Sequence, residues 1–156
     1  DQDDTLGTLY FDHLYPMGVS ALVEAVALVR AGSAPRIEQN HSLATYEGWC
    51  RSEDARINWQ APVPDLYNLI RGCDPSPGAN TTFKDDKVSF FRASVNPGNT
   101  NRDPGTVTDI TSGSFTVAAK GGSISISRVQ VNQMRKMSAP DFIEYSSLKN
   151  GDTFGS

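Results

Sequence analysis

The apolar positions of the first 34 residues recur at the three- and four-residue spacing of an α-helix. They form two groups, the first of Leu6, Leu9, Tyr10 and Leu14 and the second of Val19, Leu22, Val23, Val26 and Val29. Asp4 or Thr5 can cap the start of the first group, and Gly32 is typical of the residue that follows a helix. Pro16 and Gly18 separate the two groups and predict an interruption. We therefore expect two consecutive helices here.

The next segment, residues 35–61, shows no sustained hydrophobic period. This pattern predicts an extended connector with little local structure. Connectors of this length are rare inside a compact domain. We therefore expect the segment to lie against something else, such as a domain outside this chain.

A short helix is predicted over residues 62–72. Prolines occupy its first turn and Gly72 ends it. Its expected apolar face consists of Val63, Leu66, Tyr67 and Ile70. The residues 73–79 that follow are rich in proline and glycine, which indicates a junction between two elements rather than a reactive site.

The rest of the chain alternates in the manner of short strands. Five strands are predicted, over residues 79–84, 87–95, 105–110, 114–120 and 123–131. Turn residues separate most of them closely, and short neighbouring strands favour an antiparallel meander or a small barrel. After them, Ser138 can cap a last helix with Asp141 three residues on. Helices followed by a β-rich half predict an α+β fold.

Composition and charge restrict the functional classes. A hydrophobic fraction of 38% is enough to bury a core. The formal net charge of −4 argues against broad nucleic-acid binding. The charge is uneven, because the first 55 residues carry three basic against nine acidic side chains and the remainder carries eleven against nine. The acidity therefore belongs to the N-terminal third.

No residue stands out as catalytic, cofactor-binding or metal-binding. His13 and His41 lack the neighbouring Cys, Asp or Glu of a metal pair and do not adjoin a nucleophile motif. Cys50 and Cys73 have no metal spacing and form no disulfide framework, so we interpret them as reduced thiols of a cytoplasmic protein. The longest apolar run, residues 19–29, is too short to cross a bilayer, so no membrane partner is expected.

The basic side chains of the second half admit two interpretations. Scattered solvated charge is the one that the residues favour. The alternative is a patch on one rim of a barrel that contacts a phosphate backbone. The candidate residues for such acceptor or nucleic-acid contacts are Lys87, Arg92, Lys120, Arg128, Arg135 and Lys136.

Several motifs resemble, in order and spacing, the C-terminal region of the 10-formyltetrahydrofolate-dependent formyltransferases. The resemblance covers nearly the whole chain. It is carried by "DDTLGTLYFDHLYPMG" with "LVEAVALVRAG", then "ATYEGWCRSEDARINW", "LYNLIRGCDPSPGA", "PGTV", and "RKMSAPDFI" with "LKNGDTFG". The opening on "DQDD", without methionine, is typical of a fragment or a processed product.

The resemblance implies a division of the chain. Residues 1–34 would be terminal helices of the catalytic domain, 35–61 a connector, and 62–156 the C-terminal domain, which in this family is a five-stranded OB-like open β-barrel with short helices. Family members hold their catalytic Asn, His and Asp in an N-terminal Rossmann-like domain that binds the folate. Neither His13 nor His41 matches those motifs. The resemblance thus implies a missing catalytic domain as partner, 10-formyltetrahydrofolate as the parent's cofactor and no cofactor on this fragment.

Two branches of the family remain open. The helices and "ATYEG" are similar to the hydrolase domain of 10-formyltetrahydrofolate dehydrogenase, which transfers the formyl group to water. The tail is similar to methionyl-tRNA formyltransferase, which transfers it to an amino group on tRNA. Both branches often have Trp after the "PGA" turn, whereas this chain has Asn80. An RNA- or tRNA-binding OB-like module and a purely structural or dimerising domain are the alternative functions.

Overall fold

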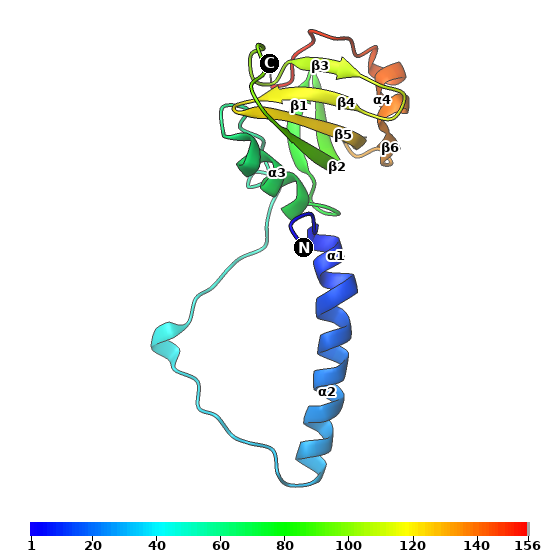
Figure 1. Cartoon of the computed structure of the whole chain (residues 1–156). Coiled ribbons are helices and arrows are strands. Elements are labelled where there is room, and N and C mark those ends of the chain that lie inside the picture. Colours follow the sequence, from blue (N-terminus) through cyan, green and yellow to red (C-terminus); the bar gives the residue numbers. More distant parts are fainter. Residues whose placement is uncertain (156) are drawn as a thin grey trace. The chain divides into compact units, whose positions relative to one another are not determined.

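The computed structural model describes residues 1–155, which divide into two compact units. One unit joins Asp1–Leu6 to the chain from Cys50 onward, and the other is Gly7–Trp49. Figure 1 shows a long helix in the second unit and a sheet with flanking helices in the first. We describe each unit by itself. Within the described residues, no helix combines the length and the apolar character that a membrane span requires.

The Gly7–Trp49 unit is dominated by one helical run. It consists of α1 (Leu6–Thr8), the π-helix η1 (Leu9–Leu14) and α2 (Tyr15–Arg30), and the short 3₁₀-helix η2 (His41–Leu43) follows later. The predicted interruption at Pro16 and Gly18 is wrong, because both residues lie within α2. The geometry changes before Pro16 instead: the Tyr15 N–H donates to the Tyr10 carbonyl, five residues back. The wider turn gives room to the proline ring, which would crowd a carbonyl in a regular helix. Gly32 follows α2 with φ +68°, as predicted for a residue after a helix.

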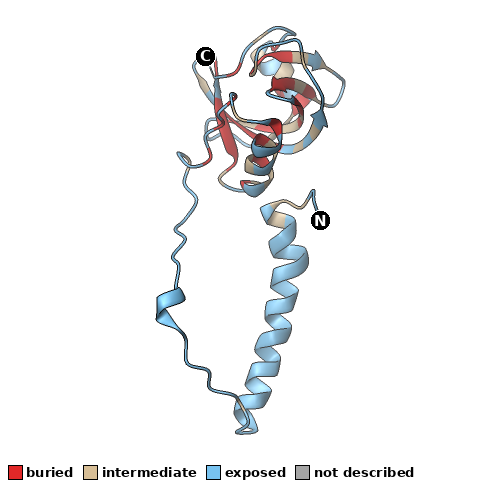
Figure 2. Cartoon of the chain, turned by 60° about the vertical axis from the view of Figure 1, so that its left-hand side comes forward, coloured by how far each residue is buried: buried red, intermediate tan, exposed pale blue. Residues whose placement is uncertain are grey.

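The apolar side chains of this helix are exposed. No residue of η1 or α2 is buried among the residues described, and Figure 2 shows these two elements in the colour of exposed residues. Leu14, Leu22 and Val29 are 58%, 66% and 67% exposed. A helix with this many unburied apolar side chains normally packs against another surface.

The first unit is built on an antiparallel sheet. Its strands are β1 (Ala79–Phe83), β2 (Asp86–Pro97), β3 (Val107–Ile110), β4 (Phe115–Ala119), β5 (Gly122–Val131) and β6 (Met137–Ser138). The five predicted strands are all present, and the two-residue β6 is additional. The strand order is β1-β2-β5-β4-β3, with β6 beside β5. The sheet is therefore not a simple meander, because β2 pairs with β5 and not with β3.

The pairing of β2 with β5 has a physical reason. These are the two longest strands, and they pair from Val88↔Val131 to Pro97↔Gly122. Placing them at the centre buries the largest number of alternating apolar side chains, including Phe90, Ile124 and Ile126.

The sheet does not close by strand pairing between β1 and β3 in the part of the chain described. The C-terminal segment lies between these two edges instead. The Phe154 N–H donates to the Gly105 carbonyl at 2.9 Å, and the Gly155 N–H donates to the Thr82 carbonyl at 2.8 Å. Backbone groups of the edges thereby gain partners that a closed barrel would supply from strands.

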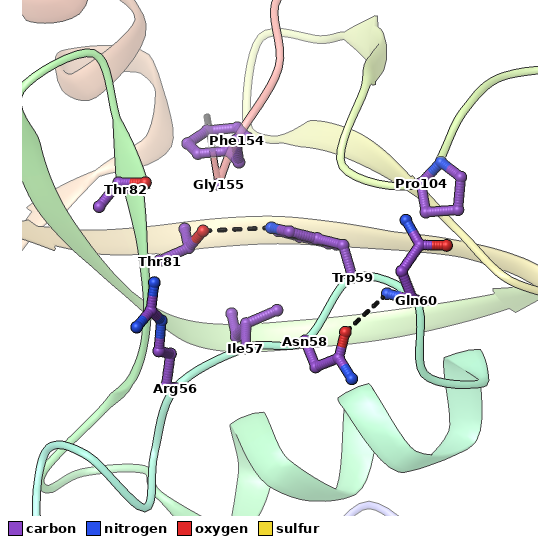
Figure 3. A pocket seen from close by; sticks show the side chains of 10 residues that line it. All are labelled: Arg56, Ile57, Asn58, Trp59, Gln60, Thr81, Thr82, Pro104, Phe154 and Gly155. Atoms are coloured by element: carbon purple, nitrogen blue, oxygen red, sulfur yellow. Dashed lines mark hydrogen bonds between the residues drawn. The ribbon is translucent and has the colours of Figure 1, made fainter.

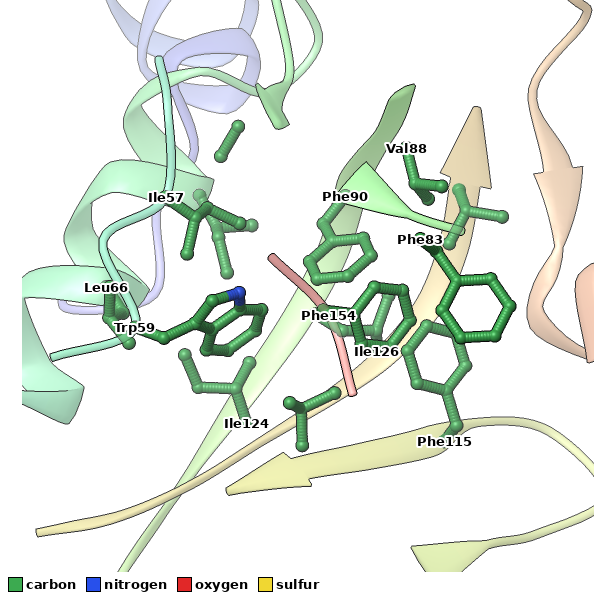
Figure 4. Close-up of a cluster of buried hydrophobic side chains, with 14 of the residues drawn as sticks. Ile57, Trp59, Leu66, Phe83, Val88, Phe90, Phe115, Ile124, Ile126 and Phe154 are labelled. Carbon is green, nitrogen blue, oxygen red and sulfur yellow. The ribbon is translucent and has the colours of Figure 1, made fainter. Parts of the chain in front are cut away.

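The core is a cluster of aromatic rings around Phe154 (Figure 4). The ring centroid of Phe154 lies 5.0 to 6.5 Å from those of five other rings. These rings belong to Trp59, Phe83, Phe90, Phe115 and Phe142. Phe154 is 4% exposed, so the last residues of the described chain complete the core.

Two helices cover this core. α3 (Val63–Gly72) buries Val63, Leu66 and Ile70, as predicted. Tyr67 was predicted on the same face but is only half-buried, and its hydroxyl donates to Asp3 Oδ1 at 2.7 Å. α4 (Ala139–Ser146) begins with the predicted capping pair.

Candidate functional site

A groove runs beside β1 and is formed by two neighbouring pockets. The first has a volume of about 470 Å³ and is lined by Arg56, Ile57, Asn58, Trp59, Gln60, Thr81, Thr82, Pro104, Phe154 and Gly155 (Figure 3). The Trp59 indole N–H donates to Thr81 Oγ1 at 3.1 Å, which fixes the ring in the pocket wall. The wall thus combines an aromatic surface with polar side chains.

The second pocket extends the groove with more charge. Its volume is about 550 Å³, and it shares Arg56, Thr81 and Thr82 with the first. Lys87 and Glu53 also line it, and Lys87 Nζ donates to Ser52 Oγ. Two cations and one carboxylate therefore face this part of the groove, an arrangement that suits a polar ligand with negative charge.

The groove exists because residues 55–59 alternate between core and solvent. Ala55, Ile57 and Trp59 are buried, whereas Arg56 and Asn58 are exposed. The segment pairs with β1, since the Ile57 N–H donates to the Asn80 carbonyl at 2.8 Å and the Asn80 N–H to the Ala55 carbonyl at 2.7 Å. From the sequence we expected residues 35–61 to be extended and without a hydrophobic period. That expectation missed the alternation of residues 55–59, although the letters "ARINW" display it.

A second polar site is a basic cluster, which we define as Arg92, Arg128 and Lys136. Lys136 Nζ lies 3.5 Å from the centroid of the buried Phe91 ring and donates to the Pro75 carbonyl at 2.7 Å. Burial lowers the pKa of Lys136, the carboxylate of Asp74 opposes that effect, and Arg128 and Arg92 add to it. Both arginines and Asp74 therefore lie near enough to Lys136 to act on its charge.

The backbone positions this cluster. Arg92 has φ +50° within β2, and its N–H donates to Asp74 Oδ2 at 3.1 Å. The Arg92 carbonyl accepts from Ser127 Oγ at 2.9 Å. Hydrogen bonds therefore hold the left-handed backbone conformation of Arg92 through both its N–H and its carbonyl. Arg128 pairs with Phe91 across the ladder.

Gly78 allows the Phe91 ring to approach the preceding turn. It has φ +84°, and a Cβ atom there would lie 2.5 Å from Phe91 Cζ. No other residue type fits this position without moving the ring on which Lys136 lies.

The six predicted contact residues fall into different places. The structure brings Arg92, Arg128 and Lys136 together, while Lys87 lines the groove. Lys120 is exposed after β4, where its carbonyl accepts from the Val63 N–H at 2.8 Å. Arg135 is exposed in the turn between β5 and β6. Whether these residues contact an acceptor remains a prediction.

The remaining candidate side chains do not converge. His13 lies exposed in η1 and His41 in η2. Among residues 1–155 there is no group of three or more His, Cys, Asp or Glu side chains that could hold a metal ion. Cys50 and Cys73 are both free thiols, of which Cys50 is exposed and Cys73 is buried. Asn80, predicted to weaken stacking on nucleic acid, is buried and donates to the Ser52 carbonyl at 2.8 Å.

The sequence of the β-rich part of the chain matches a known class of domain. A family model described as "Formyl transferase, C-terminal domain" matches residues 50–147. The chain belongs to this family of formyl transferase C-terminal domains, as the sequence motifs indicated.

Relatives from both branches resemble the chain. Methionyl-tRNA formyltransferase of Desulforamulus reducens is 34% identical over 97% of this chain and 48% of its own length. Cytosolic 10-formyltetrahydrofolate dehydrogenase of Xenopus laevis is 47% identical over 59% of this chain and 10% of its own length. The human dehydrogenase is 45% identical over 60% of this chain. The matched region thus spans about half of the first relative and a tenth of the second.

Solved structures share the fold. The crystal structure of a HypX variant from Aquifex aeolicus superposes with a TM-score of 0.77 over 92% of this chain and 26% of its own. Its sequence is 16% identical. A further HypX structure, in complex with tetrahydrofolic acid, superposes with a TM-score of 0.65.

Proposed function

We propose that this chain is the C-terminal part of a protein that transfers the formyl group of 10-formyltetrahydrofolate to an acceptor. The observation that carries the proposal is the 34% identity that extends over 97% of the chain to one half of a methionyl-tRNA formyltransferase. The other half of such a protein would bind the folate and supply the catalytic groups. In this proposal the chain binds no cofactor and is not catalytic by itself.

The exposed apolar side chains of the N-terminal helix support the assignment of residues 1–34 to the catalytic domain. Residues 1–34 would belong to the catalytic domain, and their exposed apolar side chains would be covered by it. The β-rich domain, an OB-like barrel left open between β1 and β3, would follow the connector. The parent would work in the cytoplasm, because the Xenopus laevis and human dehydrogenases that resemble the chain are named as cytosolic.

The β-rich domain would form the acceptor side of the reaction. In the parent, an acceptor nucleophile attacks the formyl carbon, and polar groups of the other half stabilise the tetrahedral intermediate. The basic cluster offers contacts for a phosphate backbone, which favours tRNA as the acceptor over water. Lys87, Lys120 and Arg135 would extend these contacts along the domain.

The experiment has two arms. First, the purified chain is incubated with 10-formyltetrahydrofolate, with and without initiator methionyl-tRNA. We expect neither formyl transfer nor hydrolysis, and clear turnover by the chain alone would overturn the proposal.

Second, the double substitution Arg128→Ala and Lys136→Ala is made in the full-length parent. We expect KM for the tRNA to rise about tenfold or more with little change in kcat, and the salt dependence of tRNA binding to weaken. Arg102→Ala, an exposed cation in the loop before β3, is the matched control. Equal tRNA affinity for both variants would favour water as the acceptor, or the alternative of a structural domain.

A further inference from the structure

The groove beside β1 has charged side chains in one pocket and uncharged amide side chains in the other. We propose that it binds a nucleoside 5′-phosphate, with the phosphate beside Arg56 and Lys87 and the base beside Asn58 and Gln60. The two pockets, of about 470 Å³ and about 550 Å³, each have the size of a small-molecule site. Every described residue that lines them lies outside the basic cluster. The inference therefore does not depend on which acceptor receives the formyl group.

The cations of the groove are available to an anion. Within residues 1–155, the Arg56 guanidinium has no hydrogen-bond partner, and the single salt bridge joins the Asp1 amino group to Asp4. Lys87 Nζ donates to Ser52 Oγ, and an ammonium group has two further N–H donors. A guanidinium and an ammonium group that line the same pocket suit the free oxygens of a phosphate.

Glu53 restricts which anions fit. It lines the same pocket as Arg56 and Lys87. Its carboxylate repels a ligand that is negatively charged along its whole length, and it accepts hydrogen bonds from hydroxyl groups. A ribose next to the phosphate offers two neighbouring hydroxyl groups, which an acidic side chain binds in known nucleotide sites. This pocket therefore favours a ribose phosphate over a polyanion.

The other pocket offers amide groups for a base. Asn58 Oδ1 accepts from the Gln60 N–H at 3.1 Å, so the Asn58 side-chain NH₂ group still has donors to offer. The Gln60 amide also lines the pocket and is exposed, while Pro104 and Trp59 supply apolar wall (Figure 3). Amide side chains pair with the edge of adenine, because they carry a donor and an acceptor side by side. Adenosine 5′-monophosphate is therefore the appropriate probe.

The groove is formed before a ligand binds. Ile57 and Trp59 are buried in the core on either side of Asn58, and the Ile57 N–H donates to the Asn80 carbonyl at 2.8 Å. The Trp59 indole is further held by its hydrogen bond to Thr81. In an extended segment, alternate side chains point the same way, so residues 56, 58 and 60 face the groove together. Little backbone ordering then opposes binding.

The first part of the test compares ligands on the purified chain by isothermal titration calorimetry. Adenosine 5′-monophosphate should bind with a Kd below about 1 mM. Adenosine, which lacks the phosphate, and ribose 5-phosphate, which lacks the base, should each bind about tenfold more weakly. The trinucleotide ApApA identifies the source of the nucleotide. Equal or weaker binding assigns the site to a free nucleotide, and clearly tighter binding assigns it to the end of an RNA strand.

The second part uses variants that separate the two ends of the groove. Arg56→Ala should weaken binding of both adenosine 5′-monophosphate and ribose 5-phosphate by about tenfold. Gln60→Ala should weaken binding of the nucleotide several-fold and leave that of ribose 5-phosphate unchanged. Arg36→Ala is the matched control for the loss of one positive charge, because Arg36 is exposed in the Gly7–Trp49 unit.

Three results would overturn the proposal. One is no heat of binding for adenosine 5′-monophosphate at concentrations up to roughly 5 mM. Another is equal affinity for the nucleotide and inorganic phosphate, which would reduce the groove to a site for any small anion. The third is an equal loss of affinity in Arg56→Ala and Arg36→Ala, which would show that only the net charge matters. The ligand comparison needs no variant, so a substitution that impairs folding does not remove the test.

Discussion

The thiol of Cys73 lies at the end of α3, where burial raises its pKa to about 11. An unfolded cysteine has a pKa of roughly 8.5. Because the folded pKa is the higher one, the stability that this difference contributes is fully present below the unfolded pKa. It is lost as the pH rises from there through about 11, since the unfolded state gives up its proton first.

This difference predicts an alkaline loss of stability that depends on Cys73. Under reducing conditions, the free energy of unfolding of the wild type should fall by about 3 kcal/mol more than that of Cys73→Ala between roughly pH 8 and 11. Urea denaturation at a series of pH values measures both. Ser112→Ala, in an exposed bend that is remote in sequence from Cys73, serves as the control and should follow the wild type. Parallel profiles for wild type and Cys73→Ala would show that the thiol does not titrate differently in the folded chain.

At the scale of elements, the capping box of α4 is the clearest case of local determination. Ser138 Oγ accepts from the Asp141 N–H at 3.3 Å, and Asp141 Oδ2 accepts from the Ser138 N–H at 3.3 Å. Ser138→Ala removes the first of these bonds and leaves a helix N–H without its partner. We expect the free energy of unfolding to fall by about 1 kcal/mol in urea denaturation. Ser112→Ala, in an exposed bend, is the control, and an equal loss in both variants would contradict the capping role.

Helices were predictable where a pattern of residues close together in the sequence determines them. The spacing of Val63, Leu66 and Ile70 predicted the buried face of α3, and the Ser138–Asp141 pair predicted the start of α4. Strand pairing was not predictable in the same way, because the β2–β5 ladder joins residues far apart in sequence. The continuity of the helix through Pro16 was also missed, because a local change to π geometry accommodates the proline.

At the scale of the whole chain, family membership was readable from ordered motifs, whereas the candidate site was readable only in part. The sequence named all three members of the basic cluster, but it could not show that Arg92, Arg128 and Lys136 meet around Phe91. That meeting depends on the β2–β5 register and on a turn at Gly78. The groove beside β1 was missed because its wall comes from segments that are distant in sequence, among them residues 52–60, β1, Pro104 and the chain end at Phe154.

The C-terminal segment illustrates how completely the fold depends on distant contacts. Phe154 comes after every helix and strand, yet its ring lies at the centre of the aromatic cluster and its N–H binds the segment before β3. A strand pair between β1 and β3 would close a barrel without it. In this sheet, the C-terminal segment at Phe154 and Gly155 lies between the edges at β1 and β3. Removal of the Phe154 side chain should therefore open the core to water.

Phe154→Ala therefore tests whether the tail is an integral part of the domain. Removing a buried phenylalanine ring from such a cluster is expected to cost about 3–5 kcal/mol in the free energy of unfolding. Urea denaturation, followed by tryptophan fluorescence, suits the measurement because the Trp59 ring lies 6.3 Å from that of Phe154. Phe11→Ala is the matched control, since Phe11 is 64% exposed and should change stability by less than about 0.5 kcal/mol. If both variants unfold at the same urea concentration as the wild type, Phe154 is not required for the core, and the domain is held by its strand pairs alone.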